Sequence, residues 1–185
     1  MKNKACIAII AVIFLSAAFF YIDGTETVKM ELKSTAFNAN GKIPSEHTCD
    51  GKNTIPELMV SGVPKGAKSL VLIMDDPDIP ESVKQSRGIN VFDHWIAFNI
   101  NPKTSIIEEG KEPEGVLGKN GAGSLGYIGP CPPDREHRYF FKLYAIDTTL
   151  DLPEGSTKAE VESAMEGHIL EQAELIGRYL RVSKD

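Results

Sequence analysis

The sequence has no cluster of basic residues. Its 20 lysines and arginines are outnumbered by 26 aspartates and glutamates, which gives a formal net charge of -6. An acidic chain without a basic patch is a poor partner for nucleic acid, so we expect no nucleic-acid binding. Internal repeats, low-complexity tracts and coiled-coil heptads are also missing, and 185 residues are enough for one domain with a substantial core.

Metal and nucleotide motifs are missing too. Cys49 and Cys131 have no CxxC or HxxxH partner nearby, and no HExxH sequence is present, so the chain offers no recognisable zinc site. Residues 121–126 (GAGSLG) match the spacing of a dinucleotide-binding loop, but a loop precedes them and no helix can begin at residues 127–130 (YIGP). We therefore expect neither a bound metal nor a cofactor.

Cysteine is scarce, with three residues in the chain. Cys6 belongs to the N-terminal segment, which leaves Cys49 and Cys131 in the body. In an oxidising compartment this pair can form a disulfide, whereas two buried thiols are the alternative. The sequence leaves both states open.

Two lysines precede a long apolar run at the N-terminus. Lys2 and Lys4 are followed by an uncharged, mostly apolar segment over residues 5–22, which is the pattern of an export signal. Its length lies between a signal peptide's apolar core and a full membrane span, so residues 1–22 are interpreted as a signal peptide or an N-terminal membrane anchor. Both place the body outside the cytoplasm, secreted or anchored to the membrane. A buried core helix is a weaker alternative, because one face of such a helix is normally polar.

The body begins after this segment, with a linker over residues 23–29 and one domain over residues 30–185. Residues 69–74 (SLVLIM) form a continuous apolar run, typical of a central strand buried on both faces. Further strands are expected at residues 28–32, 92–100, 139–147 and 175–182. Helices are expected late, at residues 158–166 after an N-cap at Ser156 or Thr157 and in a short segment at 168–172, while residues 81–90 are expected to be a polar loop. This order excludes a doubly wound α/β sheet and favours an antiparallel β-sandwich.

Polar residues stand at the ends of these expected strands. Asp76 and Asp78 follow the buried run and are held among prolines that end the strand. His137 and Tyr139 enter a later strand on one face, which leaves Arg138 on the opposite face as a structural or rim residue. Each is ordinary when taken alone, but strand ends where loops converge are where scaffolds build polar sites.

His94 lies near the start of the strand at residues 92–100. Strict alternation along that strand puts His94 on the same face as Ile96 and Phe98, with Trp95 and Ala97 on the other.

Several separated blocks of the chain resemble one family. Residues 76–80 (DPDIP), 93–100 (DHWIAFNI) and 126–147 (GYIGPCPPDREHRYFFKLYAID) are similar to the signature blocks of the phosphatidylethanolamine-binding protein family. Residues 47–53 (HTCDGKN) and 164–170 (AMEGHIL) resemble its bacterial and archaeal Raf-kinase-inhibitor-like branch. The resemblance runs from about Met30 to Arg181, and it implies a mainly β, Greek-key antiparallel sandwich with a few short C-terminal helices and a small anion-binding pocket at one end.

The resemblance also implies which residues line that pocket: Asp76, Asp78, His94, Gly129, Cys131, His137 and Tyr139. Two departures stand out. Val60 lies where this branch is expected to carry a tryptophan, and residues 134–136 (DRE) replace a glycine-containing approach to His137. Both changes are expected to alter the rim of the pocket and its charge.

The implied function is a non-enzymatic binding or regulatory protein. Two imidazoles, a tyrosine hydroxyl and loop amides supply the convergent donors that a phosphate or phosphorylated head group needs. An aspartate beside them can orient a histidine N–H or accept a hydrogen bond from a monoprotonated phosphate. We expect anion affinity to rise on acidification towards the histidine pKa. Inhibition of a serine protease or a kinase is a further implication of the resemblance.

The alternative is a hydrolase. Asp76, Asp78, His94 and His137 could serve a phosphoesterase, with or without a divalent metal, although no activated nucleophile is recognisable.

Overall fold

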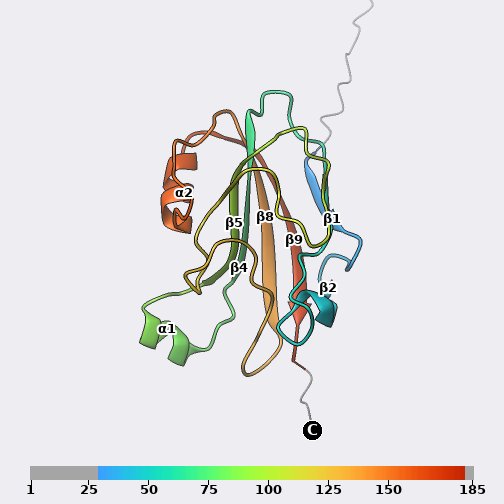
Figure 1. Ribbon diagram of the computed structural model, residues 1–185, viewed down its shortest axis with the longest axis vertical. Helices are drawn as coiled ribbons and strands as arrows, with labels where there is room; N and C mark the ends of the chain where they lie inside the picture. The colour runs from blue at the N-terminus through green and yellow to red at the C-terminus, as the bar shows by residue number, and fades with distance from the viewer. Residues whose placement is uncertain (1–28, 182–185) are drawn as a thin grey trace, which may run out of the picture.

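The computed structural model describes residues 29–181, which form two β-sheets with short helices around them (Figure 1). The smaller sheet has the order β1-β3-β6, from Glu31–Ser34, Leu58–Ser61 and Ile106–Ile107. The larger sheet has the order β2-β9-β8-β4-β5-β7, from Gly41–Lys42, Ile169–Tyr179, His137–Ile146, Ser69–Asp76, Phe92–Ile100 and Val116–Leu117. The helices are a short 3-10 turn η1 (Ser45–His47), α1 (Glu81–Arg87) and α2 (Lys158–Met165).

The predicted signal peptide or anchor at residues 1–22 lies outside the described residues, as do residues 23–28 of the predicted linker. Within residues 29–181, no helix is both long enough and apolar enough to cross a membrane. Export of the body therefore stays a prediction from the sequence.

Strand β4 is the centre of the larger sheet, because all 8 of its residues are buried. On one face, Leu72 and Met74 enter a core that they share with Leu32 of the smaller sheet. On the other face, Ile73 enters a second core with Val161 of α2. Figure 1 shows the resulting layers, with the smaller sheet on one side of β4 and α2 on the other. The predicted mainly β sandwich is confirmed.

Some elements differ from the sequence prediction. The expected loop at residues 81–90 contains α1, which begins after Pro80 and ends at Gly88, whose φ of 66° is left-handed. None of the residues of α1 is buried, so the helix has no apolar stripe that a periodicity argument could detect. The helices are therefore not confined to the C-terminal part of the chain.

The last strand is longer than predicted. Residues 168–172, expected to form a second short helix, instead begin β9 at Ile169. Gly167, with a φ of 78°, turns the chain out of α2, and β9 then pairs with β8 from Ile169 opposite Ile146 onwards. Pairing with a neighbouring strand outweighs the local helical propensity of this segment.

The larger sheet is also not wholly antiparallel. The short strand β2 runs parallel to β9, with Gly41 opposite Gly177 and Lys42 opposite Arg178. All other pairings of named strands are antiparallel. The first strand is shifted as well, because β1 begins at Glu31 rather than at residue 28.

Antiparallel pairing explains where the polar residues meet. Strand β4 pairs with both β5 and β8, so its C-terminal end lies beside the N-terminal ends of those two strands. The segments that carry Asp76, His94 and His137 are therefore brought together at one end of the sheet, next to the loop that leads to α1 (Figure 1).

Candidate functional site

Four of the predicted site residues form one buried cluster at this end of the sheet. Asp76 is 3% exposed, His94 5%, and both His137 and Tyr139 0%. Ionisable side chains are rarely buried to this extent unless they are paired, so the partners of each one define what the cluster can do.

A β-bulge turns His94 into the cluster. Met74 lies opposite Trp95 while Asp75 lies opposite Asp93, so His94 is an extra residue between two paired positions of β5. Its ring packs edge-on against Tyr139, with ring centroids 5.2 Å apart. The prediction that His94 shares a face with Ile96 and Phe98, which enter the second core, is therefore wrong, because a bulge shifts the alternation by one residue.

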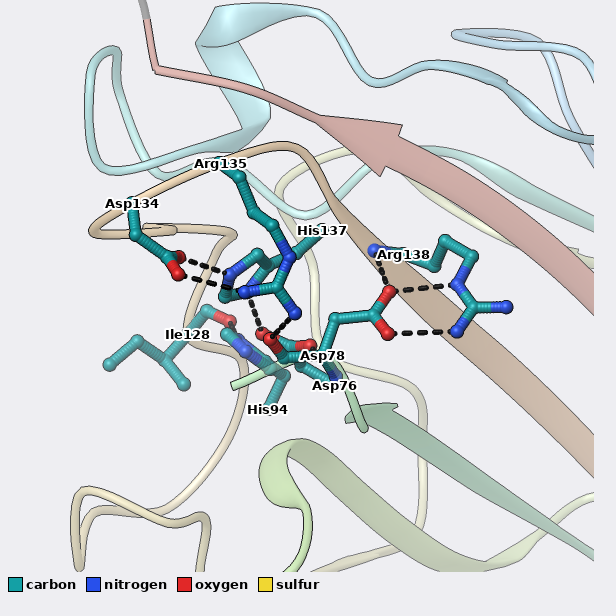
Figure 2. A network of polar contacts seen from close by, with 8 residues as sticks. All are labelled: Asp76, Asp78, His94, Ile128, Asp134, Arg135, His137 and Arg138. Carbon is teal, nitrogen blue, oxygen red and sulfur yellow. Dashed lines mark hydrogen bonds and ion pairs between the residues drawn. The ribbon is translucent and has the colours of Figure 1, made fainter. Parts of the chain in front are cut away.

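His137 is held by carboxylates at both ring nitrogens (Figure 2). Its Nδ1 lies 2.7 Å from Asp76 Oδ2, and its Nε2 lies 2.8 Å from Asp134 Oδ1. Carboxylates accept hydrogen bonds, so both contacts are satisfied together when the imidazole carries a proton on each nitrogen. Asp76 is itself fixed, because its Oδ1 accepts a hydrogen bond from the Asp78 backbone N–H at 2.8 Å.

Asp78 faces Arg138 rather than the buried cluster (Figure 2). Arg138 Nε and Nη2 donate to its two carboxylate oxygens at 2.7 and 2.8 Å, and the Arg138 backbone N–H donates at 3.0 Å. These hydrogen bonds lower the pKa of Asp78 to about 2. The pair ties the segment after β4 to the start of β8, which gives both residues a structural role beside the cluster.

His94 is oriented by a backbone carbonyl. Its Nδ1 lies 2.7 Å from the Ile128 carbonyl oxygen, and a carbonyl only accepts, so Nδ1 carries the proton. Burial lowers the pKa of His94 below its usual value of 6.5. The neutral ring then keeps Nε2 as an acceptor, and protonation converts that nitrogen into a donor.

The Tyr139 hydroxyl is the feature that points to a ligand. Among residues 29–181 it is the buried side-chain polar atom that lacks a hydrogen-bond partner. The Cys131 backbone N–H approaches it without normal hydrogen-bond geometry, and burial raises the pKa of Tyr139 above its usual value of 10.0. An unsatisfied buried polar group costs about 1–3 kcal/mol, which a ligand oxygen would recover.

The loop before β8 forms one wall of the cluster. Cys49 and Cys131 are joined by a disulfide, one of the two states that the sequence left open. Gly129 donates its N–H to Asn53 Oδ1 at 2.7 Å, so this amide holds the loop in place instead of facing a ligand. A Cβ at position 129 would lie 2.5 Å from the His47 carbonyl oxygen, which explains the need for glycine there.

Asp134 and Arg135 close the cluster from the solvent side (Figure 2). Arg135 Nη1 donates to Asp134 Oδ2 at 2.8 Å, and its Nη2 donates to the Asp78 carbonyl oxygen at 2.8 Å. The sequence marked residues 134–136 as a departure in the pocket rim but did not predict these contacts. The signal that could have found them is the spacing of an aspartate three residues before a strand-end histidine.

Other features of the described chain lie elsewhere. A groove of about 880 Å³ runs between β1 and β9, and none of the predicted site residues lines it. Within residues 29–181, no group of three or more His, Cys, Asp and Glu side chains has an arrangement that could hold a metal ion.

Comparison with known proteins adds the family. Residues 33–180 match the family model described as phosphatidylethanolamine-binding protein. A UPF0098 protein of Methanothermobacter thermautotrophicus is 52% identical over 158 residues, which cover 82% of this chain and 99% of that protein. A UPF0098 protein of Pyrococcus horikoshii is 42% identical over 188 residues, covering 96% of this chain and 90% of the relative.

Two crystal structures are similar in fold. A phosphatidylethanolamine-binding protein homolog from Chlamydia trachomatis has a TM-score of 0.80 and 44% identity, covering 84% of this chain and 99% of its own. E. coli YbcL, described as a new member of the mammalian PEBP family, has a TM-score of 0.74 and 28% identity, covering 83% of this chain and 99% of its own.

Proposed function

The chain belongs to the phosphatidylethanolamine-binding protein family, and from that premise we propose that it is a non-enzymatic binding protein for small oxyanions. The ligand group is a phosphate, free or as a phosphorylated head group. His94, His137 and Tyr139 bind its oxygens, and Asp76 orients His137 from behind.

The observation that carries this proposal is the buried, unpartnered hydroxyl of Tyr139. The Tyr139 ring packs against two histidine rings, with centroid distances of 5.2 Å to His94 and 6.5 Å to His137. A phosphate oxygen that accepted a hydrogen bond from this hydroxyl would satisfy it and would lie beside both imidazoles. Several convergent donors in a rigid, buried site are what binding a phosphate requires.

Asp76 has a supporting part in this site. Its carboxylate accepts from His137 Nδ1 at 2.7 Å, which fixes the ring and leaves Nε2 directed away from Asp76. A carboxylate placed behind an imidazole in this way fixes the orientation of the ring, and the ring separates the carboxylate from the ligand.

Calorimetric titration with inorganic phosphate, and separately with phosphoethanolamine, tests the proposal. Replacing Tyr139 by phenylalanine removes the hydroxyl and keeps the ring, and a hydrogen bond to a charged group corresponds to about 10–100-fold in affinity. His168→Gln is the matched control, because this exposed histidine pairs with Asp147 after α2. Binding that is lost in Tyr139→Phe and kept in His168→Gln supports the proposal, whereas equal affinity in both contradicts it.

The hydrolase alternative makes a different prediction. The Asp76–His137 pair has the geometry of an oriented base, but a base alone does not hydrolyse a phosphoester without a nucleophile or an activated water. A phosphoesterase assay with and without divalent metals decides between the two. Robust turnover that is abolished by His137→Ala would overturn the binding-protein proposal.

Inhibition of a serine protease or a kinase stays a prediction of the family resemblance. If the body is exported, as residues 1–22 suggest, an extracytoplasmic protease is the more natural target. Inhibition of a protease panel by the purified domain, with Tyr139→Phe as the comparison, is the corresponding assay.

A further inference from the structure

The outward nitrogen of His137 is already occupied by the chain itself. Asp134 Oδ1 lies 2.8 Å from Nε2, at the position from which a bound anion would accept a hydrogen bond. The His137 side chain is 0% exposed while the Asp134 side chain is 40% exposed, so Asp134 covers the imidazole from the solvent side. Its carboxylate has the charge and the acceptor oxygens of an anionic ligand, and it stands in for one.

We propose that Asp134 is an internal ligand of the pocket, which competes with an external oxyanion for His137 and thereby sets the affinity of the site. This inference rests on the proposed function, since it concerns the same pocket. An oxyanion binds only after the Asp134 carboxylate has left Nε2, because a single N–H offers one strong hydrogen bond.

Asp134 is held in place by contacts that break easily. Arg135 bonds both Asp134 and the Asp78 carbonyl oxygen, and its side chain is 56% exposed. Exposed ion pairs contribute little to stability and are screened by salt. Pro133, Asp134 and Arg135 are all exposed, so opening this segment uncovers no apolar core.

The segment is short and anchored at both ends. On one side Cys131 is tied to Cys49 by the disulfide, and on the other side β8 begins at His137. Residues 133–135 between these anchors form a lid that swings out, while Pro132 stays buried and Glu136 stays bonded to Arg178 of β9 at 3.3 Å. When the lid opens, Arg135 is released from Asp134.

The unpartnered hydroxyl of Tyr139 independently supports a second state of the pocket, in which an external anion takes the place of Asp134. Asp134 satisfies His137 but leaves the Tyr139 hydroxyl without a partner. Neither oxygen of the Asp134 carboxylate is bonded to this hydroxyl, because one is held by His137 and the other by Arg135. A tetrahedral oxyanion presents more oxygens than a carboxylate and can satisfy both His137 and Tyr139. The pocket therefore favours phosphate over a carboxylate ligand once the lid is open.

The experiment compares Asp134→Asn with the wild-type protein and with a matched control. Asp147→Asn is that control, because Asp147 forms an exposed pair with His168 Nδ1 at 2.7 Å, remote from the pocket. Inorganic phosphate is titrated calorimetrically at fixed ionic strength. We expect Asp134→Asn to bind phosphate about tenfold more tightly, since removing a competing closed state raises the apparent affinity, and Asp147→Asn to match the wild type.

Acetate provides the second arm of the test, and it probes the preference for a tetrahedral ligand. Asp134→Asn should bind acetate more weakly than phosphate. Equal phosphate affinity in the wild type and Asp134→Asn, with unchanged circular dichroism, would overturn the internal-ligand proposal alone. Absence of phosphate binding in both proteins would overturn the proposed function as well.

If Asp134→Asn does not fold, the wild-type protein still decides the question. Phosphate should shift the ring nitrogen signal of His137 and the carboxyl carbon signal of Asp134 together in nuclear magnetic resonance spectra, because phosphate replaces the Asp134 carboxylate at His137 Nε2. A shift of the Tyr139 and His94 signals with Asp134 unchanged would contradict the exchange.

Discussion

The disulfide between Cys49 and Cys131 gives the sharpest stability prediction. It joins positions separated by 82 residues along the chain. A cross-link that closes a loop of this length lowers the entropy of the unfolded chain by an amount corresponding to about 4.5 kcal/mol at room temperature. Measured values are usually smaller, so we expect the double variant Cys49→Ser/Cys131→Ser to lose about 2–4 kcal/mol of its free energy of unfolding.

Urea unfolding followed by circular dichroism measures this loss. For a domain of this size, each kcal/mol corresponds to a shift of about 2–4 °C in Tm, so the melting temperature should fall by roughly 4–16 °C. Reductant is the control, because it should destabilise the wild-type protein and leave the double variant unchanged. A loss well below 1 kcal/mol, or two titratable thiols from these cysteines in the folded wild-type protein, would show that the cross-link does not stabilise the fold in this way.

Three further predictions concern the pocket and its surroundings. Because Arg138 lowers the pKa of Asp78 to about 2, the pair stabilises the fold above the usual value of 3.8 and this stabilisation is lost as the pH falls towards 2. Asp78→Asn should therefore lose less of its free energy of unfolding than the wild type between about pH 4 and about pH 2. If the urea midpoint falls equally in both proteins over this range, the pair does not contribute this stabilisation. Burial lowers the pKa of His94 below 6.5, so the rise in phosphate affinity due to His94 should begin below that pH, and His94→Gln should flatten it in calorimetric titrations. Gly129→Ala would place a Cβ 2.5 Å from the His47 carbonyl oxygen and should lower the free energy of unfolding, measured in urea, by about 1–3 kcal/mol. A stability equal to the wild type would show that the loop around residue 129 shifts to accommodate the methyl group.

The sequence predicted the position of the central strand well, for a physical reason. The run SLVLIM at residues 69–74 is uninterrupted by polar residues, and an apolar run of that length is buried on both faces in β4. The strand at residues 92–100 was also predicted, and the strand predicted at 139–147 begins two residues earlier, at His137. Antiparallel pairing with β4 brings the N-terminal ends of both to the C-terminal end of that strand. The cluster of Asp76, His94, His137 and Tyr139 follows from this pairing.

What could not be predicted depends on contacts between distant residues. The side on which His94 lies is set by a bulge between β4 and β5, and an extra residue in a strand leaves no mark on the alternation pattern. The solvent-exposed helix α1 has no apolar face to reveal it. The position of Asp134 depends on Arg135 bonding the carbonyl oxygen of Asp78, which lies 57 positions away in the chain.

A crystal structure of the protein grown with phosphate would show directly whether the pocket binds this anion. We predict tetrahedral density that contacts the Tyr139 hydroxyl and bridges His94 Nε2 and His137 Nε2, with the Asp134 carboxylate displaced from His137. An empty site in which Asp134 stays 2.8 Å from His137 Nε2 and the Tyr139 hydroxyl stays unpartnered at saturating phosphate would contradict it.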